Sequence, residues 1–264
     1  MSLVFEQFLT ASIGDASYLV GDESARVAAI IDPQVDIQRS VNAARKQGVA
    51  VTHVVQTHVH EDFVSGATAP ANACGRAEVW VSGHDAPDDR FDHRSVRDGE
   101  ILVLGSVVLT VKQAPGHTPK HISLLDAKKD TRDAPFAALS GGSLLVEATG
   151  RTDLLGPERA QELTRARFKS LRDFFLTLED GVQVWPTHVH GSPCGAAIGD
   201  KTGTTIEYER KRNPLQQRPN EASFRKEALG DLPPKPRCYP RLKQRNTANQ
   251  PTAAPSTGVS AGFP

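Results

Sequence analysis

Residues 57–66 read Thr-His-Val-His-Glu-Asp-Phe-Val-Ser-Gly, and this stretch decides how the fold is interpreted. It follows residues 51–56, a valine-rich run that predicts a buried β-strand. In layered α/β folds, the loops at the carboxyl ends of strands hold binding groups on a rigid base. Two histidines two positions apart can reach one metal ion where the backbone turns, since neutral imidazole is a common ligand. We therefore expect His58 and His60 to be metal ligands, and Asp62 to be a ligand or to orient a ligand histidine.

Two further histidines also follow predicted strands. His117 lies in a Pro-Gly-His-Thr turn after the alternating run at residues 106–113, and the proline and glycine would aim its ring back toward the strand ends. His188 lies in a Pro-Thr-His-Val-His stretch after the apolar run at residues 182–185. Because the chain has only nine histidines, three strand ends that each carry one favour a shared metal site.

The remaining histidines are expected to have other roles. We expect His121 and His190 to be structural or to orient ligand side chains. Isolated histidines are usually structural or solvent-exposed, and we expect this of His53, His84 and His93.

The distribution of apolar runs predicts one α/β domain in which two sheets pack between helices. Short runs of apolar or alternating residues predict strands at residues 18–20, 26–31, 51–56, 78–82, 101–104, 106–113, 122–126, 136–139 and 182–185. Helical spacing or composition predicts helices from about residue 36 to Gly48, over residues 67–74, and over residues 157–178.

The composition changes near the C-terminus. We assign residues 1–212 to the folded domain, and residues 213–245 to a proline-rich C-terminal extension. Pro233, Pro234, Pro236 and Pro240 predict a rigid extended segment rather than a core element. Residues 246–264 are mostly small and polar, so they predict a disordered tail or a linker.

The charge balance argues against binding to nucleic acid or to a membrane. The 264 residues contain 31 basic and 31 acidic side chains, and no apolar run is long enough to span a bilayer. The three cysteines are widely spaced and form no CxxC pair. The N-terminus lacks the basic region of a signal peptide, so we expect a cytoplasmic protein.

These motifs resemble those of a known family. The HxHxD pattern at residues 58–62 is similar to the signature of the metallo-β-lactamase superfamily, and PGHT at 115–118, GRTD at 150–153 and the late Pro-x-His match in order. The resemblance covers residues 2–215 and implies an αββα sandwich. The segments EDFVSG, PGHTPKHIS, GRTDLLG and LPPKPRCYPRLK look most like persulfide dioxygenases and their rhodanese-fused relatives.

The resemblance implies an enzyme that oxidises a low-molecular-weight thiol persulfide to sulfite and thiol. It implies one divalent metal ion, with Fe(II) favoured and Zn(II) as the alternative, and a functional link to a rhodanese. His58 and His117 would be the two histidines of a site completed by one carboxylate. Arg151 matches a position that supports the site, which implies a structural or substrate-orienting role, although a simple salt bridge explains it equally well. Nothing in the sequence indicates the oligomeric state.

Two positions depart from the family pattern. Phe63 stands where the last histidine of HxHxDH belongs, and Gly142 stands where a carboxylate is expected. A site for two metals is therefore not expected. Three possibilities remain for a single-metal site: Asp62 or another group supplies the carboxylate, His60 completes a three-histidine site with His58 and His117, or the domain no longer binds metal well.

Two other functions fit the same residues. A zinc ion held by His58, His60 and His117 would lower the pKa of its bound water and support hydrolysis of a thioester, as in glyoxalase II. A chain that lacks ligands and ends without a rhodanese domain could instead be a non-catalytic binding module. Cys194 lies near His188 in sequence, and we expect it to be an ordinary small loop residue rather than a nucleophile.

Overall fold

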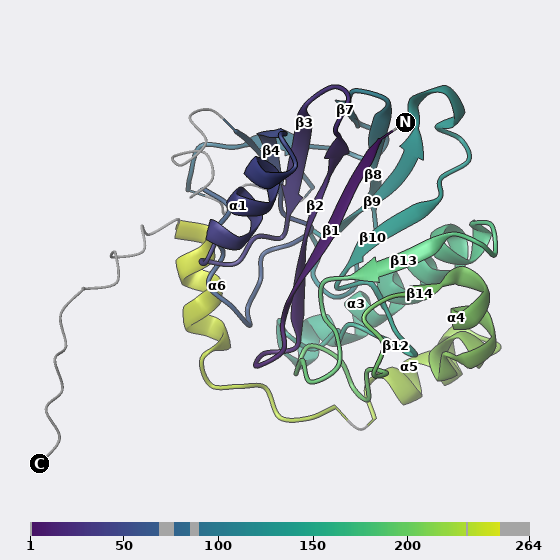
Figure 1. Ribbon diagram of the computed structural model, residues 1–264. Coiled ribbons are helices and arrows are strands. Elements are labelled where there is room, and N and C mark those ends of the chain that lie inside the picture. The colour runs from purple at the N-terminus through teal and green to yellow at the C-terminus, as the bar shows by residue number, and fades with distance from the viewer. Residues whose placement is uncertain (1, 69–76, 85–89, 231, 249–264) are drawn as a thin grey trace, which may run out of the picture.

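The computed structural model describes residues 2–68, 77–84, 90–230 and 232–248. Two six-stranded β-sheets face each other in the middle of the molecule (Figure 1). The first sheet has the order β1-β2-β3-β4-β5-β6 and the second the order β14-β13-β10-β9-β8-β7.

The strands have the following bounds. The first sheet contains β1 (Leu3–Thr10), β2 (Asp15–Asp22), β3 (Val27–Ile31), β4 (Ala50–Val55), β5 (Glu78–Ser82) and β6 (Arg94–Val96). The second contains β7 (Ile101–Leu104), β8 (Val107–Gln113), β9 (Ile122–Lys128), β10 (Ala137–Gly141), β13 (Gln183–Pro186) and β14 (Thr204–Thr205). A small hairpin is formed by β11 (Leu144–Leu145) and β12 (Ala148–Thr149).

Alternation along the strands separates the core into layers. In β2, Tyr18 and Val20 lie in the apolar cluster between the two sheets, whereas Leu19 lies in the cluster on the outer face of the first sheet. In β3, Ile31 and Ile30 divide between the same two layers. Successive side chains of a strand point to opposite faces, so a run that is apolar throughout must be covered on both faces.

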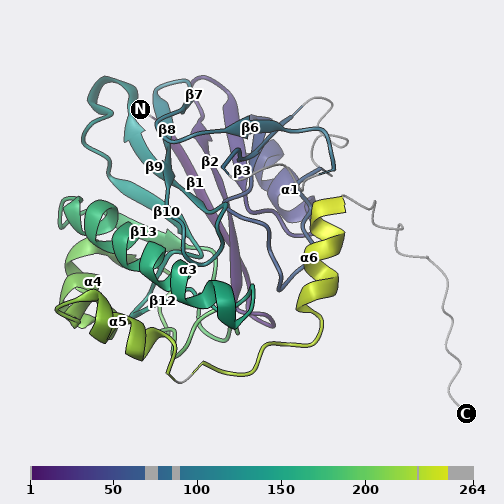
Figure 2. The same ribbon diagram turned by 180° about the vertical axis from the view of Figure 1, so that it is seen from behind.

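Helices cover both outer faces. Ala43 and Ala44 of α1 (Gln38–Lys46) pack on the first sheet. The second sheet is covered by α3 (Pro157–Lys169), its continuation through the π-turn η2 (Ser170–Phe174) and the 3₁₀ turn η3 (Phe175–Thr177), α4 (Ile206–Arg212) and α5 (Glu221–Ala228). Figure 2 shows α3, α4 and α5 gathered beside the second sheet, with α1 on the opposite side. The predicted arrangement of two sheets between helices is confirmed.

Pairing between strands brings the candidate loops to one edge of the sandwich. β3 and β4 run parallel in the first sheet, and β10 and β13 run parallel in the second, so the chain leaves each pair at the same end. The sheets are joined there by an isolated bridge between Asp15 and His188, and by a hydrogen bond of 2.8 Å from the Ile122 N–H to the Thr57 carbonyl.

The nine predicted strands agree with observed ones to within a few residues, but β1, β6, β11, β12 and β14 were not expected. Of these, β1 is the longest. Only Val4 and Phe8 of β1 are fully buried, and this spacing of four residues gives no strand-like alternation. β1 forms because all eight of its residues pair with β2. The helices predicted from about residue 36 and over residues 157–178 are confirmed. The helix predicted over residues 67–74 falls mainly outside the described residues.

The C-terminal residues are more structured than predicted. Residues 232–238 lack a helix or strand, as the prolines suggest, but α6 spans Tyr239–Ala248 and buries Tyr239 and Asn246. The predicted extended conformation is therefore wrong from Tyr239 onward. A helix can form there because Pro240 lies in the first turn of α6, where the missing N–H breaks no helical hydrogen bond.

Disorder was expected from residue 246, but residues 246–248 form the last turn of α6, and residues 249–264 lie outside the described residues. The domain boundaries at residues 212 and 245 stay predictions. Within the described ranges, no helix is long and apolar enough to cross a lipid bilayer.

The η1 turn spans Lys129–Thr131, and the η4 turn spans Pro214–Gln217.

Candidate metal centre

Three histidines from three separate loops meet in the interior. The ligand atoms of His58, His117 and His188 all lie within 4.8 Å of one another, and all three residues are buried. The Nε2 atoms of His58 and His188 are 3.3 Å apart. Two nitrogens that bind one tetrahedral metal at about 2.1 Å stand about 3.4 Å apart, so the observed spacing fits a shared cation.

Each of these rings is held through its Nδ1 atom, which lies near an oxygen of the protein. The Nδ1 of His117 is 2.8 Å from the Arg151 carbonyl, and the Nδ1 of His188 is 2.8 Å from the Asp15 carboxylate. A carbonyl or carboxylate oxygen can only accept, so each Nδ1 must carry the proton.

The same reasoning applies to His58. The Thr57 hydroxyl donates its only proton to the Asp32 carboxylate at 2.7 Å, so it accepts from the Nδ1 of His58 at 2.9 Å. The neutral forms of all three rings therefore carry the Nε2 lone pair that a metal ion requires. Partners of this kind fix the tautomer and orientation of ligand histidines.

His60 and Asp62 lie next to this group. His60, Asp62 and His188 form a second set with ligand atoms within 4.8 Å of one another, and Asp32, His58 and His60 form a third. The Asp62 carboxylate approaches the Nδ1 of His188 at 3.1 Å, while its Oδ1 has no hydrogen-bond partner. The structure thus brings together all five of the sequence-predicted metal ligands, and their roles as ligands stay a proposal.

The sequence offered His58, His60 and His117 as one possible set of three ligands, but these three are not grouped within 4.8 Å of one another. The Nε2 of His60 lies 3.1 Å from the Asp32 carboxylate, and the ring stacks on Phe63 with centroids 4.2 Å apart. His188 takes the expected place of His60 beside His58 and His117.

Burial and neighbouring charges make two of the central histidines neutral. Desolvation, together with the nearby imidazoles, lowers the pKa of His58 well below its usual value. Desolvation also lowers the pKa of His117, assisted by the charges of His188 and Arg167. Neutral imidazole is the form that binds metals.

His188 differs because two carboxylates face it. Desolvation lowers its pKa, but the charges and hydrogen bonds of Asp62 and Asp15 outweigh this and raise it to about 10. Desolvation and the charge of Asp62 raise the pKa of Asp15 to about 7. Desolvation also opposes ionisation of Asp62, but His188 reverses the effect and lowers the pKa of that carboxyl group.

Gly142 cannot be replaced by a residue with a side chain without movement of the site. A Cβ at this position would lie 2.4 Å from the Cδ2 atom of His117. The Gly142 N–H donates to the Nε2 of His121 at 2.9 Å, and its carbonyl accepts from the Arg167 guanidinium at 3.0 Å. The space in which a carboxylate would lie is therefore filled by the His117 ring, and the carboxylates beside the histidine group are those of Asp15, Asp32 and Asp62.

Arg151 contacts the histidine group through its backbone. Its carbonyl accepts from His117, whereas its guanidinium pairs with Asp153 at 2.7 Å and donates to the Pro193 carbonyl at 3.1 Å. From the sequence, Arg151 was expected either to support the site or to form a simple salt bridge, and the observed contacts match both expectations. A catalytic role for the Arg151 side chain gains no support from these contacts.

His121 lies beside the group of three, whereas the other histidines lie outside it. His121 is buried and stacks on His58 at a centroid distance of 5.0 Å. His190 is exposed and reaches the Ile198 carbonyl at 3.1 Å. His53 packs edge-on against Trp80.

Sequence reasoning missed two carboxylates of the site. Asp32 follows β3 and accepts hydrogen bonds from Thr57 and Thr187, and Asp15 begins β2 and orients His188. The strand-end rule that selected the histidines would also have selected Asp32. Nothing local marks Asp15, since its partner lies 173 positions away.

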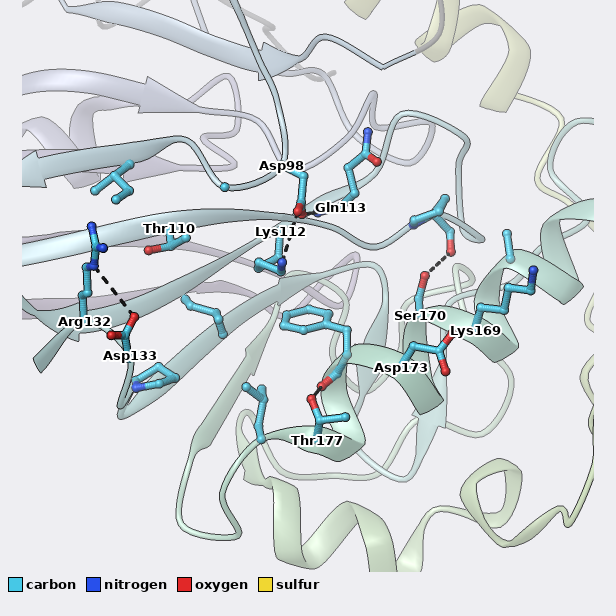
Figure 3. Close-up of a pocket in the computed structure, with 18 residues that line it drawn as sticks. Asp98, Thr110, Lys112, Gln113, Arg132, Asp133, Lys169, Ser170, Asp173 and Thr177 are labelled. Carbon is cyan, nitrogen blue, oxygen red and sulfur yellow. Dashed lines mark hydrogen bonds and ion pairs between the residues drawn. The ribbon is translucent and has the colours of Figure 1, made fainter.

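A large cavity lies away from the histidine group. It has a volume of about 800 Å³ and lies between the second sheet and the helix that leads from α3 into η2 (Figure 3). Lys112 pairs with Asp98 across its lining, and Ser170 donates to the Pro115 carbonyl at 2.8 Å. No described histidine lines this cavity. A much smaller cavity of about 10 Å³ reaches His58 beside Gln56, which is room for about a single water molecule.

Known proteins resemble the chain in sequence and in structure. A persulfide dioxygenase ETHE1 from Bos taurus is 27% identical over 200 residues, which is 75% of this chain and 70% of that protein. A hydroxyacylglutathione hydrolase from Prochlorococcus marinus is 30% identical over 125 residues, which is 47% of this chain and 49% of that enzyme. No family model matches the chain.

Two solved structures cover nearly the whole chain. A metallo-β-lactamase structure from Staphylococcus aureus superposes with a TM-score of 0.90 and 29% identity, covering 97% of this chain and 76% of that one. A structure of ETHE1 from Myxococcus xanthus superposes with a TM-score of 0.78 and 26% identity, covering 93% of this chain and 99% of that one.

Proposed function

Because the chain belongs to the metallo-β-lactamase superfamily and has persulfide dioxygenases among its relatives, we propose that it is a metal-dependent enzyme that oxidises a small thiol persulfide. The αββα fold class expected from the sequence is confirmed by the same likeness. The reaction consumes the persulfide, dioxygen and water, and it releases the thiol, sulfite and protons. The terminal sulfur is oxidised while dioxygen is reduced, so no further reductant is needed.

The observation that carries this proposal is the convergence of His58, His117 and His188 through Nε2. These rings would hold one divalent ion, with Fe(II) favoured over Zn(II). Asp62 lies beside the Nδ1 of His188, so it would orient that ring rather than bind the ion through Nε2. The metal, when bound, supplies the activation of dioxygen. The protein groups hold the rings in the correct tautomer and keep the site buried, which limits competing reactions with water.

Metal analysis combined with oxygen uptake tests the proposal. Protein loaded anaerobically with Fe(II) is expected to hold one ion per chain and to consume oxygen with glutathione persulfide, producing sulfite. His188→Ala should lose metal and activity. The matched control is His190→Ala, which removes an exposed histidine two positions away and should leave both unchanged. Iron-loaded protein that consumes no oxygen would exclude the dioxygenase.

The likeness to hydroxyacylglutathione hydrolase favours a second candidate, a zinc-dependent thioester hydrolase. The same three imidazoles would hold zinc, and the metal would lower the pKa of its bound water toward about 7. Zinc-loaded protein that hydrolyses a glutathione thioester without consuming oxygen would support this candidate. Protein that retains neither metal would support the third possibility, a non-catalytic binding module.

We also propose that the substrate is a small thiol persulfide rather than a nucleic acid or a membrane lipid, and that the enzyme works alongside a rhodanese. The equal numbers of acidic and basic side chains support the first part. The proline-rich segment before α6, which resembles that of rhodanese-fused relatives, supports the second. A cytoplasmic location stays a prediction.

A further inference from the structure

The helix α6 lies against the loop that carries His60 and Asp62, far from the helices that precede it in sequence. The chain leaves α5, runs past the ends of the strands and reaches α6 on the side of the molecule where α1 lies, as both views show (Figures 1 and 2). Residues 57–66 contain no helix or strand. The backbone N–H and C=O groups of this loop therefore need hydrogen-bond partners from other parts of the molecule.

One side chain of α6 satisfies three backbone groups of this loop. The Nδ2 of Asn246 donates to the carbonyls of His60 and Phe63, both at 2.8 Å, and its Oδ1 accepts from the Ser65 N–H at 2.9 Å. Asn246 is buried, with 7% of its surface exposed. A buried amide with its hydrogen-bonding groups paired in this way fixes the path of the backbone it contacts.

Two more residues on the same face of α6 reach the loop or its neighbours. The Lys243 ammonium pairs with Glu61 at 2.9 Å. The Tyr239 hydroxyl lies 3.3 Å from the Sγ of Cys194, and that thiol donates to the Asp62 carboxylate at 3.2 Å. Positions 239, 243 and 246 are spaced by four and three residues, so they share one face of a helix.

We propose that α6 is a positioning element of the metal centre, and that Asn246 is its principal positioning residue. This inference rests on the proposed metal site but not on the reaction catalysed there. His60 and Asp62 are attached to a backbone that Asn246 holds at His60, Phe63 and Ser65, while Val35 and Pro33 hold it at Val64 and Gly66. Removal of this amide frees the loop and weakens metal binding, although Asn246 never touches the metal.

The test compares Zn²⁺ affinity of the full chain with that of three variants, measured by competition with a chromophoric chelator. Asn246→Ala removes the three hydrogen bonds. Asn246→Asp keeps the acceptor for Ser65 but loses the two donated bonds. Gln244→Ala removes an exposed amide from the same helix and serves as the matched control. Groups that support metal ligands typically change affinity by about 10–100-fold, and we expect this loss in both Asn246 variants.

Gln244→Ala should stay within about twofold of the wild type. Amide hydrogen exchange of the metal-free proteins gives an independent readout, since exchange at residues 60–66 should accelerate in the Asn246 variants alone. Lys243→Met, which removes the cation that pairs with the buried Glu61 carboxylate, should give a smaller loss of affinity in the same direction.

Several results would overturn the inference. One is wild-type Zn²⁺ affinity in Asn246→Ala. Another is a lower melting temperature of metal-free Asn246→Ala with unchanged affinity, which is the result expected of a purely structural residue. An equal loss in Gln244→Ala would also overturn it. Wild-type protein that binds Zn²⁺ or Fe²⁺ but does not oxidise persulfide would exclude the dioxygenase while leaving the role of Asn246 intact.

Discussion

His188 differs from the other central histidines because Asp15 and Asp62 both approach its Nδ1 atom, at 2.8 and 3.1 Å. In metal-free protein these carboxylates raise its pKa to about 10, although desolvation opposes them. The ring is then protonated at neutral pH, and its Nε2 proton lies between His188 and His58. A metal ion that binds these nitrogens must displace that proton.

Metal affinity should therefore rise with pH. Between about pH 8 and about pH 9, where Asp15 is already ionised, we expect the Zn²⁺ affinity to increase about tenfold per pH unit, since one proton is released for each ion bound. Chelator competition at several pH values measures the slope. An affinity that does not change over this range would show that His188 is neutral before the metal binds.

Gly142 gives a second prediction at the scale of one residue. Gly142→Ala should lower the free energy of unfolding by about 1–3 kcal/mol, because the new Cβ overpacks against the His117 ring. Metal affinity should fall as well, and Gly142→Asp should not restore a carboxylate ligand. Gly181→Ala is the matched control, since its Cβ would meet nothing within 4 Å. Calorimetry and metal titration measure both effects, and wild-type values for Gly142→Ala would contradict the packing argument.

At the scale of elements, Asp32 connects the loops after three strands. It follows β3, accepts from the Thr57 N–H at 2.7 Å in the loop after β4, and accepts from the Thr187 hydroxyl at 2.5 Å in the loop after β13. Desolvation would raise its pKa, but His60 and these hydrogen bonds lower it instead, so the carboxylate is ionised. One buried group thus holds parts of both sheets together at the edge where the histidines meet.

Asp32→Ala should destabilise the fold by about 3–5 kcal/mol, because it leaves the buried donors of Thr57 and Thr187 without an acceptor. Denaturant unfolding of the metal-free protein measures the loss. The control is Asp36→Ala, an exposed carboxylate four residues later, which should change stability by less than about 0.5 kcal/mol. Equal stability of the two variants would mean that other contacts join these loops.

At the scale of the whole molecule, Asp126 imposes a pH dependence on stability. This residue of β9 is fully buried, neither carboxylate oxygen has a hydrogen-bond partner, and desolvation raises its pKa to about 8. Above the ordinary pKa of 3.8, the unfolded chain releases a proton that the folded protein retains. The unfolded state then binds fewer protons, so stability falls as pH rises from about 4 to about 8.

Asp126→Asn should remove this slope. The variant should match the wild type near pH 4 and exceed it by about 5 kcal/mol near pH 8, as measured by urea unfolding. Asp130→Asn, which changes an exposed carboxylate in η1, serves as the control and should follow the wild-type curve. A variant that is less stable than the wild type at both pH values would show that the carboxyl group is not the source of the slope.

The sequence by itself determined nine of the fourteen observed strands and most of the histidine loops. Strands such as Glu78–Ser82 and Ile101–Leu104 were predicted with their observed bounds, since local apolar patterns report burial directly. His58, His117 and His188 were candidates because each follows a strand, and strand ends meet at the edges of a sheet. The superfamily was suggested by the resemblance of those motifs to a known family.

Only the tertiary structure decided which groups share the site and what supports them. The pairing of His188 with Asp15 joins residues 173 positions apart, and Asn246 reaches His60 across 186 positions. His60 turned toward Asp32, and His188 took the place beside His58 and His117. Contacts of this kind depend on how two sheets and a returning helix pack, and no local periodicity in the chain records that packing.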